Sequence, residues 1–303
     1  MKKILVIYYS QTGQVKDIIK SVLSDGENDE YIQIDYYKIE PEKNFPFPWQ
    51  PTSAFYNVFP ESVKGISAPV KPLIINKPEQ YDLVILGLQV WYLSPSIPVN
   101  SFLKSTDAKK NLKDKPVITI YGTRNMWISA NKTVKELIKK AGGNLKGNIV
   151  FSDKHHNLIS VITIVRWLIK GKKEASKYFP EAGVSGKDIS EASKFGKPIL
   201  KALKNNNFKT LQKELLKLNA VHIDYHIMKT ELTGKRIFNI WADLILKHSE
   251  NNSKKRKRLL KLFSYYLFLV IYLISPFASF IFRLKKLIFT EKTKKEILKY
   301  TSL

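Results

Sequence analysis

The first residues suited to binding chemistry stand in the polar turn Ser10-Gln11-Thr12-Gly13-Gln14-Val15. Ser10 and Thr12 carry hydroxyl groups, and Gly13 allows unusual backbone dihedrals and a close approach to a ligand. Hydroxyls and backbone N–H groups at the start of a helix can hold a phosphate monoester, because the helix dipole favours negative charge there. The turn therefore predicts a phosphate site built from all six residues.

The same turn lacks the two common nucleotide fingerprints. A P-loop needs Gly-Lys-Ser/Thr, a dinucleotide site needs three spaced glycines, and neither pattern is present in the turn. A mononucleotide such as flavin mononucleotide (FMN) is then the favoured ligand. The alternative is a helix cap that binds nothing, since so short a motif also serves that purpose.

Two later loops carry groups that suit a flat ring. One holds Gln89, Val90, Trp91 and Tyr92, and the other holds Gly122, Thr123, Arg124, Asn125 and Trp127. We predict that Trp91, Tyr92 and Trp127 stack on an isoalloxazine ring while backbone amides face its polar edge. The alternative is that these aromatic side chains are ordinary core or rim packing.

Arg124 and His156 are the predicted catalytic residues. The Arg124 guanidinium could stabilise a carboxylate or a developing enolate. His156, with His155 beside it, could relay a proton, although a histidine pair at this place is more often loop surface. Five histidines and no cysteine argue against a metal site, and the lack of cysteine excludes thiolate nucleophiles.

The elements that must position these loops form an α/β pattern. Largely apolar runs at residues 3–9, 31–35, 82–87, 116–122 and 148–152 predict five strands, with helical spacing between them. This alternation predicts a doubly wound parallel sheet that binds its ligand at the carboxyl ends of the strands. We assign residues 1–204 to this domain and residues 205–250 to a helical extension.

Residues 41–78 interrupt the pattern between the second and third strands. The segment contains Phe45-Pro46-Phe47-Pro48-Trp49 and then Phe55, Tyr56 and Phe59. It is too proline-rich to predict a helix and too aromatic to be a plain linker. We expect an ordered lid or pocket wall.

Residues 251–303 form a basic and apolar tail. The whole chain has a net charge of +25, and this tail, with thirteen Lys or Arg and two Glu, carries +11 of it. Residues 263–282 have no charge and are flanked by basic clusters at 254–258 and 283–286. This arrangement predicts contact with an anionic membrane, as a span, a re-entrant dip or an in-plane helix, and a cytoplasmic protein held at the inner face. The alternative is a buried core helix.

The first turn resembles that of flavodoxins, which have Ser/Thr-x-Thr-Gly-x-Thr at the same place. Val15 departs from the pattern and puts one phosphate contact in doubt. The resemblance implies a flavodoxin-like fold with FMN as cofactor. The composition of this chain adds a helical, membrane-associating C-terminal extension to that fold.

Four further runs resemble dialkylresorcinol condensing enzymes of flexirubin and aryl-polyene-type lipid pathways. They are Pro46-Phe47-Pro48-Trp49, Val58-Phe59-Pro60-Glu61-Ser62-Val63, Arg124-Asn125-Met126-Trp127 and Ala182-Gly183-Val184-Ser185. The resemblance implies a long-chain cyclohexanedione or resorcinol substrate. Condensation by acylation of a cysteine is excluded here, whereas a flavin can accept a hydride. We therefore expect FMN-dependent aromatisation of a ring made by a separate ketosynthase.

Three other functions compete with this one. An NAD(P)H-dependent quinone or FMN reductase would use the same fold and cofactor, and its nicotinamide site need not leave a motif. A flavodoxin-type electron carrier is usually short and acidic, unlike this chain. Nucleic-acid binding is disfavoured because it would rest on charge alone, without a recognition motif.

Overall fold

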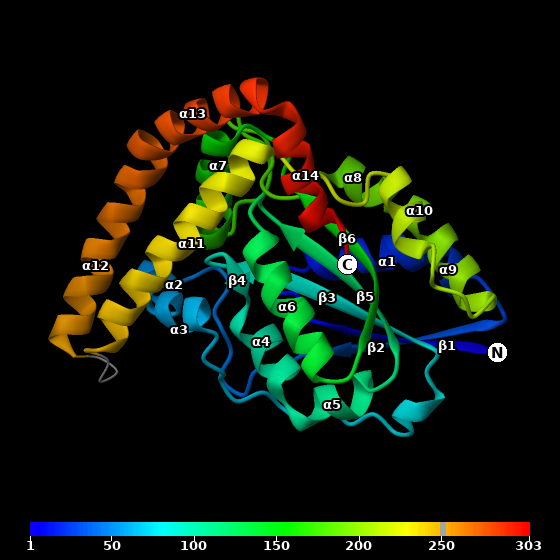
Figure 1. Cartoon of the computed structure of the whole chain (residues 1–303). Coiled ribbons are helices and arrows are strands. Elements are labelled where there is room, and N and C mark those ends of the chain that lie inside the picture. The colour runs from blue at the N-terminus through cyan, green and yellow to red at the C-terminus, as the bar shows by residue number, and fades with distance from the viewer. Residues whose placement is uncertain (249–252) are drawn as a thin grey trace.

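The computed structural model describes residues 1–248 and 253–303, without the side chains of residues 286 and 287. Its centre is a parallel sheet in the order β2-β1-β3-β5-β6, with helices on both faces (Figure 1). The strands are β1 (Lys2–Tyr8), β2 (Ile32–Lys38), β3 (Leu83–Trp91), β5 (Pro116–Thr123) and β6 (Asn144–Ser152). A short strand, β4 (Ser94–Pro95), pairs antiparallel with the end of β3. The parallel order is that of the flavodoxin-like doubly wound fold, which confirms the predicted fold class.

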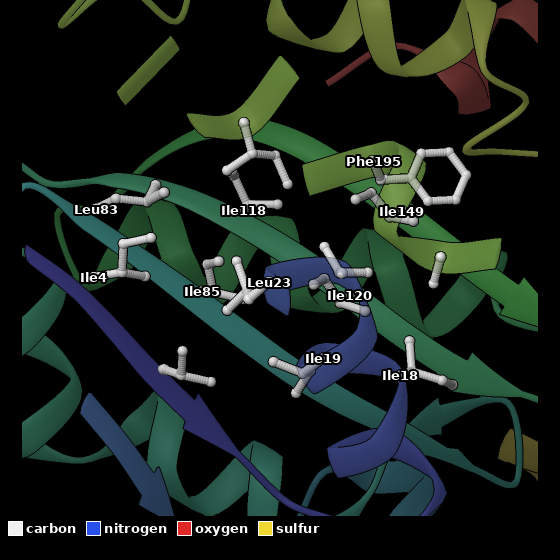
Figure 2. Packing of buried hydrophobic residues seen from close by; sticks show 14 of the residues in the cluster. Ile4, Ile18, Ile19, Leu23, Leu83, Ile85, Ile118, Ile120, Ile149 and Phe195 are labelled. Carbon is white, nitrogen blue, oxygen red and sulfur yellow. The ribbon is translucent and has the colours of Figure 1, made fainter. Parts of the chain in front are cut away.

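The central strands are apolar on both faces because helices cover both. On one face lie α1 (Gln14–Glu27), α9 (Gly196–Lys204) and α10 (Leu211–Lys217). Figure 2 shows isoleucines of neighbouring strands facing the α1 side chains Ile18, Ile19 and Leu23. On the other face lie α4 (Ile97–Lys104), α5 (Thr106–Leu112) and α6 (Ile128–Lys140). These two layers fix the carboxyl ends of the strands, where the predicted loops begin.

The expectation that residues 41–78 contain no helix is wrong. The segment forms α2 (Thr52–Asn57) and α3 (Phe59–Lys64), followed by the 3₁₀ turn η1 (Pro78–Gln80). Pro51 is the N-cap of α2 and Pro60 lies at the start of α3. Proline is tolerated at these positions because the first N–H groups of a helix have no partner within it.

The chain after β6 is helical. It contains α7 (Asn157–Lys170), α8 (Gly186–Ser190), η2 (Glu191–Phe195) and α11 (Tyr225–Leu246), and the tail contains α12 (Lys254–Leu269), the π-helical turn η3 (Val270–Ile274), α13 (Ser275–Ile288) and α14 (Thr290–Thr301). Figure 1 shows the tail running along α11, crossing near α7 and returning toward β6. The boundary predicted at residues 250 and 251 lies outside the described residues. Leu211, Leu215 and Ala220 belong to the main core, so part of the predicted extension packs on the sheet.

Both ends of the tail are attached to the rest of the protein. Phe263 of α12 stacks on Phe59 of α3 with ring centroids 3.7 Å apart and planes 22° apart. At the other end, Glu296 of α14 pairs with Lys229 of α11 at 2.8 Å. The tail is therefore docked along one side on the insertion and on α11.

The opposite side of the tail is exposed and apolar. Lys254–Lys285 forms one continuous helical stretch of 32 residues, long and apolar enough to cross a membrane, and its most apolar window is only 6% buried. Phe268, Leu273, Phe277 and Phe280 are each at least 60% exposed. The alternative of a buried core helix is wrong for this segment. Its length and composition alone are weak evidence for a membrane.

Candidate functional site

A cavity of about 210 Å3 lies at the carboxyl ends of β1, β3 and β5. The three predicted loops all reach it. Its lining includes every residue predicted to contact the cofactor except four: Ser10, Gly13, Asn125 and Trp127. The predicted residues in the lining are Gln11, Thr12, Gln14, Val15, Gln89, Val90, Trp91, Tyr92, Gly122, Thr123 and Arg124. We call this space the cofactor cavity.

The first turn leads into α1, with Gly13 as the N-cap at φ 87°. Only glycine adopts this left-handed conformation without strain. The backbone N–H groups of the first turn of α1 lack partners within the helix, although the Ser10 hydroxyl accepts a 3.4 Å contact from the Lys16 N–H. Val15 is buried against the core. It can offer a ligand its backbone N–H but no polar side-chain group. The turn is thus able to receive an anion through its N–H groups and the Thr12 hydroxyl.

Side-chain amides hold this turn in place. Gln11 donates its backbone N–H to the Gln89 side-chain oxygen at 3.1 Å and its side-chain amide to the Pro46 carbonyl at 2.8 Å. Gln14 donates to the Val184 carbonyl at 3.0 Å and accepts from the Val184 N–H at 3.2 Å. The two glutamines thereby tie the turn to β3, the insertion and the loop at residue 184.

The second loop is a tight hairpin between β3 and β4. Its central residues, Tyr92 and Leu93, have φ values of 48° and 60°. Two successive positive φ values are typical of a type I′ turn, in which non-glycine residues are strained. The Tyr92 hydroxyl donates to the Phe55 carbonyl at 2.8 Å, and burial raises the pKa of Tyr92 well above its ordinary value. The Tyr92 ring is thus fixed in an aromatic cluster. The Trp91 ring, which also lines the cavity, makes edge-to-face contacts with Tyr9, Phe45 and Trp49 at centroid distances of 5.9, 5.1 and 5.5 Å.

Arg124 follows β5 and reaches the cofactor cavity from the third loop. It donates from Nη1 to the side-chain oxygen of Asn157 at 2.7 Å. Burial lowers the pKa of Arg124 to about 10, while Asp153, Glu231 and Tyr272 act in the opposite direction. The guanidinium therefore remains charged at neutral pH. Tyr272 lies in η3, so a residue of the tail contributes to the electrostatic environment of Arg124.

Three cavity walls were not predicted as cofactor contacts. Trp49, Phe55 and Val58 come from the insertion, which confirms the prediction that it forms a pocket wall. Ile164, Trp167 and Leu168 come from α7, and Gly183 comes from the loop before α8. Residues 158–169 are mostly apolar in the sequence, but the sequence does not show that this run faces the cavity.

Trp127 does not stack in the cofactor cavity, so that expectation is wrong. Trp127 is 2% exposed and packs with Ile128, Tyr225 and Met228 between α6 and α11. It lines a separate cavity of about 480 Å3. The reason is that β5 ends before residue 127, and the chain has already turned into α6 at that point.

The other predicted residues lie beside the cofactor cavity. Asn125 donates to the Asn157 side-chain oxygen at 2.8 Å and lines the cavity of about 480 Å3. His155 pairs through Nδ1 with the buried Asp153 carboxylate at 2.8 Å and lines that same cavity. His156 is exposed at the N-cap of α7 and lines none of the cavities described here. Its catalytic role stays a prediction.

Among the described residues, no three or more His, Cys, Asp or Glu side chains are grouped so that they could hold a metal ion. The buried carboxylate of Glu231 instead holds a helix N-terminus. It accepts from the Ile128 and Ser129 N–H groups at 3.1 and 2.6 Å, at the start of α6. Burial raises the pKa of Glu231 despite these hydrogen bonds.

Neither the protein-family models nor the curated proteins gave a match to this chain. Among solved structures, a flavoprotein from Lactobacillus acidophilus NCFM in complex with FMN is 17% identical, with 50% of this chain and 93% of that one covered, at a TM-score of 0.39. A flavodoxin from the domain Archaea is 14% identical, covering 67% and 99%, at 0.37. A Fusobacterium nucleatum flavodoxin bound to FMN is 11% identical, covering 67% and 99%, at 0.37. The strand order of the sheet identifies the chain's own fold as flavodoxin-like.

Proposed function

We propose that this chain binds FMN in the cofactor cavity and uses it in a redox reaction. The observation that carries the proposal is the convergence of three loops, each chosen from the sequence for flavin chemistry, on one cavity at the carboxyl edge of the sheet. Known FMN proteins of the same doubly wound order bind the cofactor at this edge. Solved structures similar to this chain include flavoproteins described as complexes with FMN.

The residues present fit such a cofactor. The N-terminus of α1 offers N–H groups and the Thr12 hydroxyl to a phosphate, and Trp91 offers a flat apolar surface to a ring. The cavity volume of about 210 Å3 is below the roughly 300–1,000 Å3 of typical ligand sites. Only part of a mononucleotide fits inside it, so we expect the phosphate at the open turn.

We further propose that the reaction aromatises a dialkyl-cyclohexanedione to a dialkylresorcinol. This change removes two electrons and two protons from the ring. FMN, when bound, supplies a hydride acceptor, which takes both electrons and one proton, and the second proton passes to a base. Arg124 would hold an enolate oxygen of the substrate, because this positively charged residue lines the cavity.

The residues around the cavity support the proposal of an apolar substrate whose ring is built by another enzyme. Trp49, Phe55 and Val58 give it apolar walls. Because the chain has no cysteine, a separate ketosynthase would have to build the ring. The exposed apolar side of the tail, bordered by basic residues, would hold the enzyme at the inner face of a membrane where such lipids reside.

The first test is an absorption spectrum of the protein purified in mild detergent, followed by anaerobic addition of a dialkyl-cyclohexanedione. The proposal predicts an oxidised flavin band that bleaches as a resorcinol appears. Bleaching only with NAD(P)H would favour the reductase. Reversible reduction by a chemical donor, with neither substrate effective, would favour an electron carrier. Absence of flavin after reconstitution with FMN would refute the cofactor assignment.

A further inference from the structure

A third cavity is formed mainly by the insertion and is completed by Ile97 of α4 and Arg256 of α12. It has a volume of about 690 Å3, within the roughly 300–1,000 Å3 of small-molecule sites. Trp49 and Val58 line both this cavity and the cofactor cavity, so the two adjoin. We call it the Arg256 cavity, after the residue that α12 contributes to it.

Most of the Arg256 cavity is apolar. Phe45, Pro46, Trp49, Val58, Ile66 and Ile97 supply aromatic and aliphatic surface from the insertion and from α4. Charged residues in the lining are Glu42, Lys43, Glu61 and Arg256. Such a composition suits a ligand that is mainly hydrocarbon and carries a small polar group.

Arg256 is the polar group that this cavity leaves incompletely paired. The residue is only 5% exposed. Its Nη2 donates to the Asn57 carbonyl at 2.9 Å and to the two Glu61 carboxylate oxygens at 2.8 and 3.1 Å. Its Nη1 is buried and has no hydrogen-bond partner among the described residues. A buried donor left unpaired is unfavourable, so an acceptor oxygen that reached Nη1 after a small shift of the side chains around it would be favoured.

We propose that the Arg256 cavity binds an apolar chain bearing an acceptor oxygen, and that Arg256 Nη1 donates to this oxygen. Glu61 already balances the guanidinium charge, so the oxygen is recognised by a directed hydrogen bond more than by net charge. The inference rests on the proposed function only where it identifies the ligand as that enzyme's substrate. A long-chain substrate would then extend from the cofactor cavity past Trp49 and Val58.

The test uses dodecanoate as the probe and isothermal titration calorimetry on the full-length protein, at dodecanoate concentrations below micelle formation. We expect one dodecanoate per chain. Ala54→Trp narrows the cavity and keeps the Arg256–Glu61 pair, and we expect at least tenfold weaker binding. Arg256→Lys keeps a positive charge opposite Glu61 but removes Nη1, and we expect a similar loss. Ala175→Trp, at an exposed position outside the cavity, is the matched control and should bind as the wild type does.

Equal affinity in Ala54→Trp and Ala175→Trp would overturn the inference, and so would wild-type affinity in Arg256→Lys or no binding by the wild type. Binding is read here without any flavin signal. If dodecanoate binds as expected but a dialkyl-cyclohexanedione leaves the flavin oxidised, the proposed function fails and the cavity assignment stands. If the substrate reduces the flavin but dodecanoate does not bind, the cavity assignment fails and the proposed function stands.

Discussion

At the scale of single residues, the site depends on a few positions with little freedom. Gly13 must adopt φ 87° at the start of α1, and Gly183, at φ 81°, leaves no room for a side chain. A Cβ at Gly183 would lie 2.8 Å from the Gln14 side-chain oxygen and 2.8 Å from a Trp167 ring carbon. Gly183 therefore permits a close approach of the loop before α8 to α1 and α7, whereas Gly13 is needed for its backbone conformation.

Replacement of Gly13 by Val should remove the cofactor. A left-handed conformation costs an ordinary residue about 1–2 kcal/mol, and a β-branched side chain adds crowding at the phosphate turn. We expect at least tenfold weaker FMN retention, measured as bound flavin per protein after gel filtration. Gly186→Ala is the control, because a Cβ there meets nothing within 4 Å. Unchanged flavin content in Gly13→Val would refute the phosphate assignment.

Lys235 should make stability depend on pH. Burial lowers the pKa of Lys235 to about 8, although its ammonium group donates to the Val63 carbonyl at 3.0 Å. Between pH 8 and the ordinary lysine value of about 10.4, the unfolded chain binds more protons, so stability rises with pH. Relative to Lys235→Met, the wild type should gain about 2 kcal/mol of unfolding free energy over this range, after allowance for partial exposure.

Urea unfolding at pH 7.5 and pH 10.5 measures this difference. Lys132→Met, at an exposed position on α6, serves as the comparison for general effects of lysine removal. A constant gap between wild type and Lys235→Met across both pH values would contradict the prediction. Burial of a charged lysine that is only partly paired is the physical cause of the expected gap.

At the scale of elements, the insertion and the tail form one unit. The buried residues Phe59, Val63, Ala242, Ile245, Leu260 and Phe263 form a hydrophobic cluster shared by α3, α11 and α12. The Arg256–Glu61 ion pair, at 2.8 Å, lies beside this cluster. The tail therefore helps to position the same insertion that forms a wall of the cofactor cavity.

Phe263→Ala should loosen this attachment. Phe263 is fully buried, and truncation of a buried Phe to Ala typically costs about 3–5 kcal/mol. We expect a loss in that range in thermal or urea unfolding. Phe268→Ala, on the same helix but 66% exposed, should change stability by less than about 0.5 kcal/mol. Equal effects of the two substitutions would show that the tail is not held by this cluster.

At the scale of the whole molecule, charge and apolar surface lie on the same side. Lys254, Lys255, Lys257, Arg258 and Lys261 are all exposed on α12, the helix that continues into the exposed apolar stretch. Figure 1 shows α12 and α13 along one side of the molecule, away from α5. This separation suits binding to an anionic membrane surface, where each basic residue contributes about 1 kcal/mol.

Replacement of these five basic residues by Gln should weaken binding to anionic vesicles by at least a hundredfold, since about 1 kcal/mol is lost per residue. Vesicle sedimentation at low and high salt measures the effect, and wild-type binding should fall as salt rises. The control replaces Lys109, Lys110, Lys113, Lys139 and Lys140, which are exposed on or beside α5 and α6. Equal loss in both variants would indicate a response to net charge alone.

The sequence by itself determined the sheet and most of the cofactor cavity. Strand runs, turn residues and their order are local patterns, and the carboxyl ends of parallel strands meet at one edge. Gln11, Gln89 and Gly122 could therefore be assigned to one place before any coordinates were known. The apolar character of the tail was equally local, because it depends on composition alone.

Only the tertiary structure decided which distant segments close the site. The α7 wall with Trp167, the docking of Phe263 on Phe59 and the pairing of Arg256 with Glu61 join residues far apart in sequence. The structure also shows that Trp127 lies outside the site, because the turn into α6 directs its ring into the core. Periodicity shows which face of a helix is apolar, but the partner of that face depends on packing across the whole chain.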